Sequence, residues 1–237
     1  MATIKKIESN FKPNHLGLIP NNWSVKILGE VATFVNGKAY KQEELLQTGK
    51  YKVLRVGNFF TKGEWYYSDL ELDKDKYVND GDLMYAWSAS FGPKFWHGKK
   101  TIYHYHIWKV LPSDMAIKEY LYYFLLFDAE KILQTKQGGT MFHVTKGDIE
   151  KRKITLPPRR EQCTIVELLN TWSLAIEKYE MLIIQKDNTK KWLTRQLLTG
   201  KKRVGGFNEK WKAACLGDFF ERVTRKNDEV NTTVVTI

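Results

Sequence analysis

The sequence predicts an α/β (α+β) domain followed by a long, coiled-coil-forming α-helix. Short apolar and β-branched runs, separated by turn residues, fill the first two-thirds of the chain. Such runs are typical of strands, and one stretch among them changes to helical spacing. Further on, no Pro or Gly occurs from Arg159 to Thr199, and apolar residues there recur three and four positions apart.

The β-rich part begins at residues 19–29, after a polar stretch over residues 1–17 that we expect to be a frayed N-terminal arm. Residues 51–58, 83–87 and 101–111 are predicted to be strands, and residues 34–40 a short strand and a turn around Asn36-Gly37. Helical spacing follows at residues 117–135, then a Gly-Gly loop at 137–140 and a short helix or turn at 145–151. We therefore expect one folded domain over residues 18–155.

The long helix is predicted from its ends and from its periodicity. Pro157 and Pro158 can open a helix, because a first-turn proline loses no helical hydrogen bond, and Gly200 stands where a C-cap is expected. A helix of this length spans roughly 60 Å at about 1.5 Å per residue, so it needs a partner to bury its apolar stripe. Lys186 and Lys190 interrupt that stripe. The predicted helix-interface residues are Ile165, Leu169, Trp172, Ile176, Tyr179, Ile183, Leu193 and Leu197.

The two ends of this segment carry a family resemblance. LPPRREQ at residues 156–162 and LLTGKKRV at residues 197–204 resemble the conserved helical region of the specificity (S) subunit of type I restriction-modification systems. In that family the helical region follows each target-recognition domain. The resemblance implies that residues 18–155 are a target-recognition (DNA-binding) domain. It also implies that residues 156–205 are a helix for dimerisation and spacing.

After the helix the chain begins to repeat itself. Residues 211–218 match residues 23–30, with Trp, Leu-Gly and an acidic residue at the same spacing. Full-length members of the family have two recognition domains and two helical regions. We therefore interpret residues 206–237 as the truncated start of a second recognition domain, and the chain as a half-length S subunit.

Composition bounds the partners and the compartment. The formal net charge of +11 favours a polyanionic partner, and nucleic acid is the usual one. The two cysteines, Cys163 and Cys215, favour a reducing compartment with free thiols. No signal peptide is visible after Met1 and no apolar run reaches ~18 residues, so we expect a cytoplasmic protein without a membrane span.

Catalytic motifs are not found. The Pro157-Pro158 pair lacks the flanking residues of an adenine-methyltransferase motif, and no P-loop sequence occurs. His104 and His106 are predicted to share a strand face, but no third residue at metal-site spacing joins them. Cys163 is expected to be a packing residue. We expect no cofactor in this chain, and the resemblance implies that S-adenosylmethionine, ATP and Mg would belong to partner subunits.

Three stretches combine basic groups with side chains that can reach base edges: residues 55–62, 87–97 and 137–146. The third matches, in position and type, a small-residue turn that in the family lies near DNA. The other two are inferred from their composition, and a solvated or packing role stays open for every residue. The predicted DNA-binding residues are Arg55, Asn58, Lys62, Trp87, Ser88, Lys94, His97, Gln137, Thr140, His143 and Lys146.

The resemblance implies a DNA-recognition subunit without catalytic residues of its own. It would direct methyltransferase (M) subunits and a restriction (R) subunit to a bipartite target in double-stranded DNA. Because one helical region leaves an unsatisfied stripe, we expect a two-fold homodimer with antiparallel helices. Two alternatives stay open: a stand-alone DNA-binding or decayed regulatory protein without partner subunits, and an enzyme with an unfamiliar site.

Overall fold

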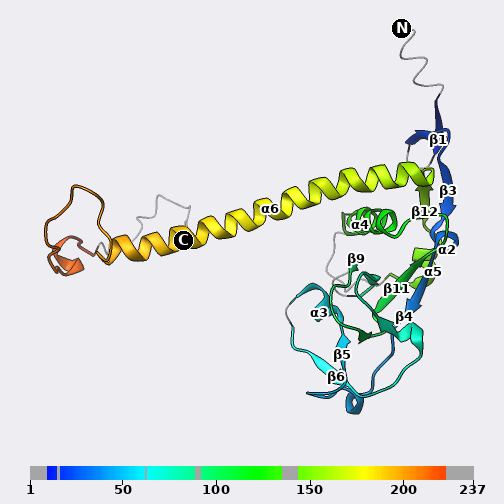
Figure 1. The fold of residues 1–237 in the computed structure, drawn as a ribbon, viewed down its shortest axis with the longest axis horizontal. Coiled ribbons are helices and arrows are strands. Elements are labelled where there is room, and N and C mark those ends of the chain that lie inside the picture. Colours follow the sequence, from blue (N-terminus) through cyan, green and yellow to red (C-terminus); the bar gives the residue numbers. More distant parts are fainter. Residues whose placement is uncertain (1–9, 15–16, 62, 89–91, 135–143, 223–237) are drawn as a thin grey trace, which may run out of the picture. The chain divides into compact units, whose positions relative to one another are not determined.

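The computed structural model describes residues 10–14, 17–61, 63–88, 92–134 and 144–222 (Figure 1). The chain divides into two units, Met1–Leu174 and Ala175–Ile237. The first unit contains the strands, and the long helix α6 (Arg159–Leu198) begins in it and continues into the second. A sheet-rich domain followed by a long helix confirms the predicted fold class.

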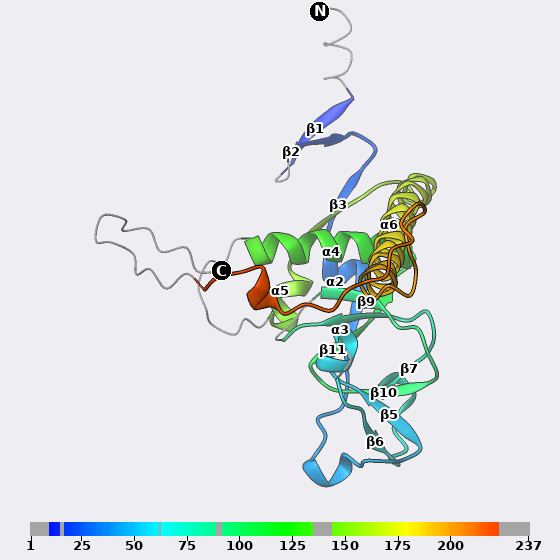
Figure 2. The ribbon, with the colours of Figure 1, turned by 90° about the vertical axis from the view of Figure 1, so that its left-hand side faces the viewer.

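Two four-stranded sheets form the body of the first unit, and Figure 2 shows them one below the other. The first sheet has the order β6-β5-β10-β7, and its strands are β6 (Tyr66–Ser68), β5 (Tyr51–Leu54), β10 (Thr101–Tyr103) and β7 (Tyr77–Val78). The second has the order β4-β11-β8-β9, with β4 (Ala32–Asn36), β11 (Ile107–Pro112), β8 (Leu83–Ala86) and β9 (Gly92–Phe95). Only β5 and β10 pair in parallel among these strands.

The main core lies around the second sheet and the helix α4 (Lys118–Gln134), which contacts β9 and β11. All four residues of β8 are buried, which is typical of a strand covered on both faces. The rings of Tyr85 and Trp87 both stack on Trp108, with centroid distances of 5.9 and 5.8 Å. Much of the aromatic content of this region therefore serves packing.

The N-terminal strands bring the start of the domain beside its end. β3 (Ser24–Ile27) pairs antiparallel with β12 (Lys153–Leu156), the strand that leads into α6. The short helix α2 (Leu28–Val31) follows, with Leu28 fully buried and its N–H donating to the Arg152 carbonyl at 2.8 Å. α5 (Lys146–Glu150) precedes β12, and the Thr145 hydroxyl caps it by accepting from the Asp148 N–H.

Residues 11–14 do not form the predicted frayed arm. They form β1 (Phe11–Asn14), which pairs antiparallel with β2 (Gly17–Pro20). Gly17 has a φ of 108°, a backbone conformation that favours glycine, and the Lys12 Nζ donates to the Asn21 carbonyl. The polar composition of this stretch concealed a hairpin whose stabilising contacts are mostly between backbone groups.

Two predicted strands are also wrong in extent. Residues 51–58 form β5 and then a separate helix, α3 (Val56–Phe60). Residues 101–111 form two strands in different sheets, because the chain turns at residues 104–106. Long-range backbone hydrogen bonds hold this turn: the His104 N–H donates to the Leu54 carbonyl, and the Tyr105 N–H donates to the Lys38 carbonyl. The first unit also contains the 3-10 turns η1 (Gln42–Glu44) and η2 (Lys74–Lys76).

The first two turns of α6 pack against the domain. Gln162 is 1% exposed; its Oε1 accepts from the Ile117 N–H, and its Nε2 donates to the Met115 and Pro157 carbonyls. Ile165 packs against the same core, so this member of the predicted stripe is partly covered by its own domain. Cys163, expected to pack, is exposed.

The end of α6 and the residues after it belong to the second unit. Gly200 has a φ of 70°, and the Lys202 N–H donates to the Gln196 carbonyl, which confirms the predicted C-cap. The 3-10 turn η3 (Leu216–Asp218) follows. Within the part of the chain that the structure describes, this unit has no strand, and no helix of either unit is long and apolar enough to cross a membrane.

Candidate nucleic-acid interface

The first predicted stretch surrounds α3. Arg55 joins β5 to α3, and its guanidinium lies 5.0 Å from the centroid of the Tyr66 ring on the neighbouring strand β6. The Asn58 Nδ2 donates to the carbonyls of Gly63 and Glu64, at 2.9 and 2.7 Å. Asn58 therefore uses both N–H groups to hold the loop after α3. Lys62 lies outside the described residues.

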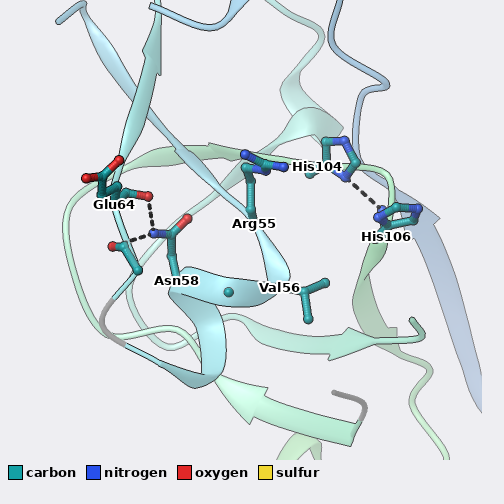
Figure 3. Close-up of a pocket in the computed structure, with 8 residues that line it drawn as sticks. Arg55, Val56, Asn58, Glu64, His104 and His106 are labelled. Carbon is teal, nitrogen blue, oxygen red and sulfur yellow. Dashed lines mark hydrogen bonds between the residues drawn. The ribbon is translucent and has the colours of Figure 1, made fainter. Parts of the chain in front are cut away.

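A recess of about 340 Å³ opens beside this helix (Figure 3). It is lined by the start of α3, by the loop after it and by the turn between β10 and β11. Three separate segments of the domain thus contribute to it. The lining residues are Arg55, Val56, Gly57, Asn58, Gly63, Glu64, His104 and His106.

The two histidines lie on the turn between β10 and β11, so the prediction that they share a strand face is wrong. The His106 N–H donates to the His104 Nδ1 at 3.5 Å. Burial, together with the nearby His106 and Arg55, lowers the pKa of His104 to about 4. His104 is therefore neutral at pH 7, and because its Nδ1 accepts, its proton is placed on Nε2. No group of three potential metal ligands occurs among the described residues.

The described residues of the second predicted stretch fall into a buried or partly buried group and an exposed group. Trp87 packs against the core, and its Nε1 donates to the Tyr105 carbonyl at 2.8 Å; Ser88 is only 5% exposed. In this structure neither presents a free group on the surface of the domain. Lys94 and His97 are exposed: the Lys94 Nζ donates to the Phe59 carbonyl at 2.9 Å, and His97 lies beside Asp80.

Most of the third predicted stretch lies outside the described residues. Gln137, Thr140 and His143 lie outside the described residues, so their proposed contacts stay predictions. Lys146 is the first residue of α5 and forms an ion pair with Glu150 at 3.7 Å. It is half exposed and close in sequence to the Thr145 cap, which fixes the direction in which α5 begins.

Sequence reasoning missed a set of cation–aromatic pairs around the recess. The Lys52 Nζ lies 4.9 Å from the Trp65 ring centroid, next to the Arg55–Tyr66 pair. Lys52 belongs to β5 and Arg55 directly follows that strand, whereas Tyr66 begins β6 and Trp65 is the residue just before it. Lysine and arginine held on aromatic faces are common where proteins bind nucleic acid. The signal was the basic run YKVLR, but no local pattern connects it to the aromatic run WYY.

Comparison with known proteins gives the family. The profile of the type I restriction modification DNA specificity domain matches residues 20–185. The type I restriction enzyme MjaVIII specificity subunit of Methanocaldococcus jannaschii is 26% identical over 221 residues, which cover 88% of this chain and 52% of that protein.

Solved structures share the fold. A chain from a study of complex assembly and conformational transition of the type I R-M system superposes with a TM-score of 0.62 at 18% identity, covering 80% of this chain and 47% of the other. The HsdS subunit from Thermoanaerobacter tengcongensis gives 0.56 at 19% identity, covering 73% and 43%. The chain therefore spans about half the length of the relatives that it matches. Because the family profile covers more than two-thirds of its residues, the chain belongs to the family of type I restriction-modification DNA specificity domains.

Proposed function

We propose that this chain is the DNA-recognition subunit of a type I restriction-modification complex and directs partner subunits to a bipartite target. The observation that carries the proposal is the family match over residues 20–185, which includes the sheet-rich domain and the first part of α6. The net charge of +11 supports DNA as the ligand, since neutralised phosphates release counterions on binding.

Specificity subunits do not catalyse reactions themselves. We propose that M subunits with S-adenosylmethionine, and an R subunit with ATP and Mg, supply the chemistry. The rival proposal is a stand-alone DNA-binding or decayed regulatory protein without partner subunits. Copurification separates the two: a methyltransferase recovered with the chain from its native host supports the first, and a chain recovered without one supports the rival.

The direct test of the function is methylation mapping. The chain and the methyltransferase encoded with it would be produced together, and methylated positions in host DNA would be sequenced. The expected result is one bipartite motif that disappears when the chain is left out. Methylation that is independent of the chain would contradict the proposal.

We further propose a two-fold homodimer through an antiparallel coiled coil of α6. From Leu169 to Leu193 the predicted stripe is exposed, with Trp172, Ile176 and Tyr179 between 57% and 67%, and Leu197 is half-buried. Burying a large apolar side chain is worth roughly 1.5–3 kcal/mol, so this row favours a helical partner. Lys186 and Lys190 lie in the same row and, together with Leu193 and Leu197, line a groove of about 460 Å³. Antiparallel packing separates these lysines from their symmetry copies, whereas parallel packing brings like charges together.

Light scattering tests the dimer with a matched pair of variants. Ile176→Asp places a charge in the predicted stripe, and Met181→Asp places the same charge about 140° away around the helix. Both side chains are exposed, at 57% and 64%, so neither substitution disturbs the domain core. The wild type and Met181→Asp should have twice the chain mass, and Ile176→Asp should be a monomer. Equal masses for the two variants would contradict the predicted interface.

The dimer has a consequence for the target. Two copies related by a two-fold axis read a half-site, a gap and the inverted half-site. The methylation motif should therefore be symmetric. An asymmetric motif, produced by a chain shown to be dimeric, would contradict this part of the proposal and leave DNA recognition itself standing.

A further inference from the structure

Several buried or half-buried cations in the first unit have a carboxylate or a carbonyl oxygen as partner, and Arg55 has neither among the described residues. Lys38 lies 3.0 Å from Glu44, and the nearly buried Lys109 lies 3.4 Å from Asp82. Arg152 forms an ion pair with Asp128 in the core. Arg55 is also half-buried, yet within the described residues its guanidinium has no hydrogen bond and no ion pair.

The missing partner matters because a charge removed from water is costly unless it is compensated. Among the described residues, the guanidinium lies over the face of Tyr66, which holds it but accepts no N–H hydrogen bond of ordinary strength. Glu64 lines the same recess without forming an ion pair with Arg55. Among the described residues, the five N–H donors of this arginine are thus held in place with no hydrogen-bond acceptor.

The recess in front of Arg55 has polar side chains in its wall and is large enough for a phosphate group. Its volume is about 340 Å³, and Figure 3 shows the Arg55 side chain between Asn58 on one side and His104 on the other. The two histidines add imidazole groups to the same wall. Because burial keeps His104 neutral at pH 7, it contributes a neutral N–H and does not repel the guanidinium.

We propose that this recess receives one backbone phosphate of the DNA, with Arg55 as the residue that binds it. The inference rests on the proposed function. A guanidinium matches two oxygens of a phosphate with two parallel N–H bonds, and the negative charge compensates the arginine.

A phosphate fits better than a base edge for two reasons. Base edges lie at the floor of a groove and are reached by side chains that project from the protein, whereas Arg55 lies in a recess. Phosphate groups project from the duplex and can enter one. A neutral base edge would also leave the half-buried charge of Arg55 uncompensated. Contacts to phosphate fix the register of a protein on DNA and carry no sequence information directly, so Arg55 should position the domain.

The test measures affinity as a function of salt for the wild type and for Arg55→Met. Fluorescence anisotropy would be used with the duplex that methylation mapping defines and with a scrambled duplex. One phosphate contact contributes about 0.9 to the slope of log K against log salt, so the variant's slope should be smaller by that amount. Over a fourfold rise in salt, its affinity should fall about 3.5-fold less than that of the wild type. The ratio of affinities for the two duplexes should stay unchanged.

Lys100→Met is the matched control. It removes the same charge from a residue next to β10 whose Nζ lies over the Tyr77 ring, outside the recess. Its slope should change by less than half as much as that of Arg55→Met. Thermal unfolding monitored by circular dichroism confirms that each variant is folded.

A second measurement locates the contact on the DNA. Single methylphosphonate linkages, which are uncharged, would be placed in turn along the duplex. One of them should weaken the wild type and leave Arg55→Met unaffected, because both changes remove the same contact.

Three outcomes would overturn the inference: equal slopes for Arg55→Met and the wild type, lost discrimination between the duplexes at an unchanged slope, or strictly additive effects of every methylphosphonate. The second outcome would mean that Arg55 reads a base. In each case specific binding by the wild type would leave the proposed function standing. Failure of the wild type to bind any duplex would instead contradict that function.

Discussion

One sequence motif occurs twice in this chain, folds in the same local way and is packed only once. Leu28 begins the short helix α2, and Leu216 begins the 3-10 turn η3. The residues before them, Ile27 and Cys215, have the same backbone angles, with φ −86° and ψ 146°. Leu28 is fully buried, whereas Leu216 is 78% exposed.

The difference lies in the neighbours. β3, which precedes Leu28, pairs with β12, and α2 contacts α5. Among the described residues of the second unit, no strand pairs with residues 212–215. The motif therefore encodes a local bend of the chain by itself, and the burial of its leucine depends on elements that lie more than a hundred residues away in the sequence.

The largest effect that would test this comparison is on Leu28. Leu28→Ala removes a fully buried side chain from the main core, which typically destabilises a protein by about 2–5 kcal/mol. Leu216→Ala changes an exposed side chain, so its effect should stay within about 0.5 kcal/mol. Urea unfolding monitored by tryptophan fluorescence gives both values. A similar loss for the two variants would mean that the second copy is buried in solution.

The parts of the fold that could be predicted from the sequence are those set by local signals, and the parts that could not are those set by distant contacts. The long helix was correctly placed, because Pro158, Gly200 and the periodicity between them are local signals. The run at residues 101–111 was predicted as one strand because most of its residues are aromatic or β-branched. Its division at Tyr105 depends on a hydrogen bond to Lys38, in another part of the chain.

The candidate site shows more clearly which features the sequence alone does not reveal. Composition singled out Arg55 and Asn58, and the structure places both at one recess. Composition could not connect Arg55 and Asn58 to His104 and His106, because these segments are brought together by the parallel pairing of β5 with β10. Trp87 looked equally suitable in the sequence, but its ring stacks on Trp108. Residue type can suggest that a side chain contacts DNA, but the fold decides whether that side chain lines the recess or packs in the core.

Two histidines extend the comparison of buried and exposed groups to the effect of pH. Burial lowers the pKa of His104 from its ordinary value of 6.5 to about 4, so the folded state resists its protonation. Its contribution to stability is therefore fully present above pH 6.5 and is lost as the pH falls towards 4. His104→Gln should lose less unfolding free energy than the wild type between pH 7 and pH 5.

The exposed His97 is the control for this measurement, since its side chain is 77% exposed. His97→Gln should follow the wild type across the same interval, measured by urea unfolding at each pH. The two buffers must have equal ionic strength, because surface charges are sensitive to salt. The same pH dependence for His104→Gln and the wild type would show that His104 is protonated as readily in the folded chain as in the unfolded one.

The smallest expected effect concerns the glycine that follows each leucine of the repeated motif. A Cβ added to Gly29 would lie 3.2 Å from the Glu150 Cβ and 3.3 Å from the Glu150 carbonyl oxygen, so α2 and α5 must separate by a few tenths of an ångström. Such overpacking costs about 1 kcal/mol. A Cβ added to Gly217 meets nothing within 4 Å, so Gly217→Ala should leave the urea midpoint of the domain unchanged. If Gly29→Ala were also neutral, the half-exposed Glu150 side chain and its backbone would have moved without any loss of stability. Close packing of α2 on α5 would then not explain why one copy of the motif is buried and the other is exposed.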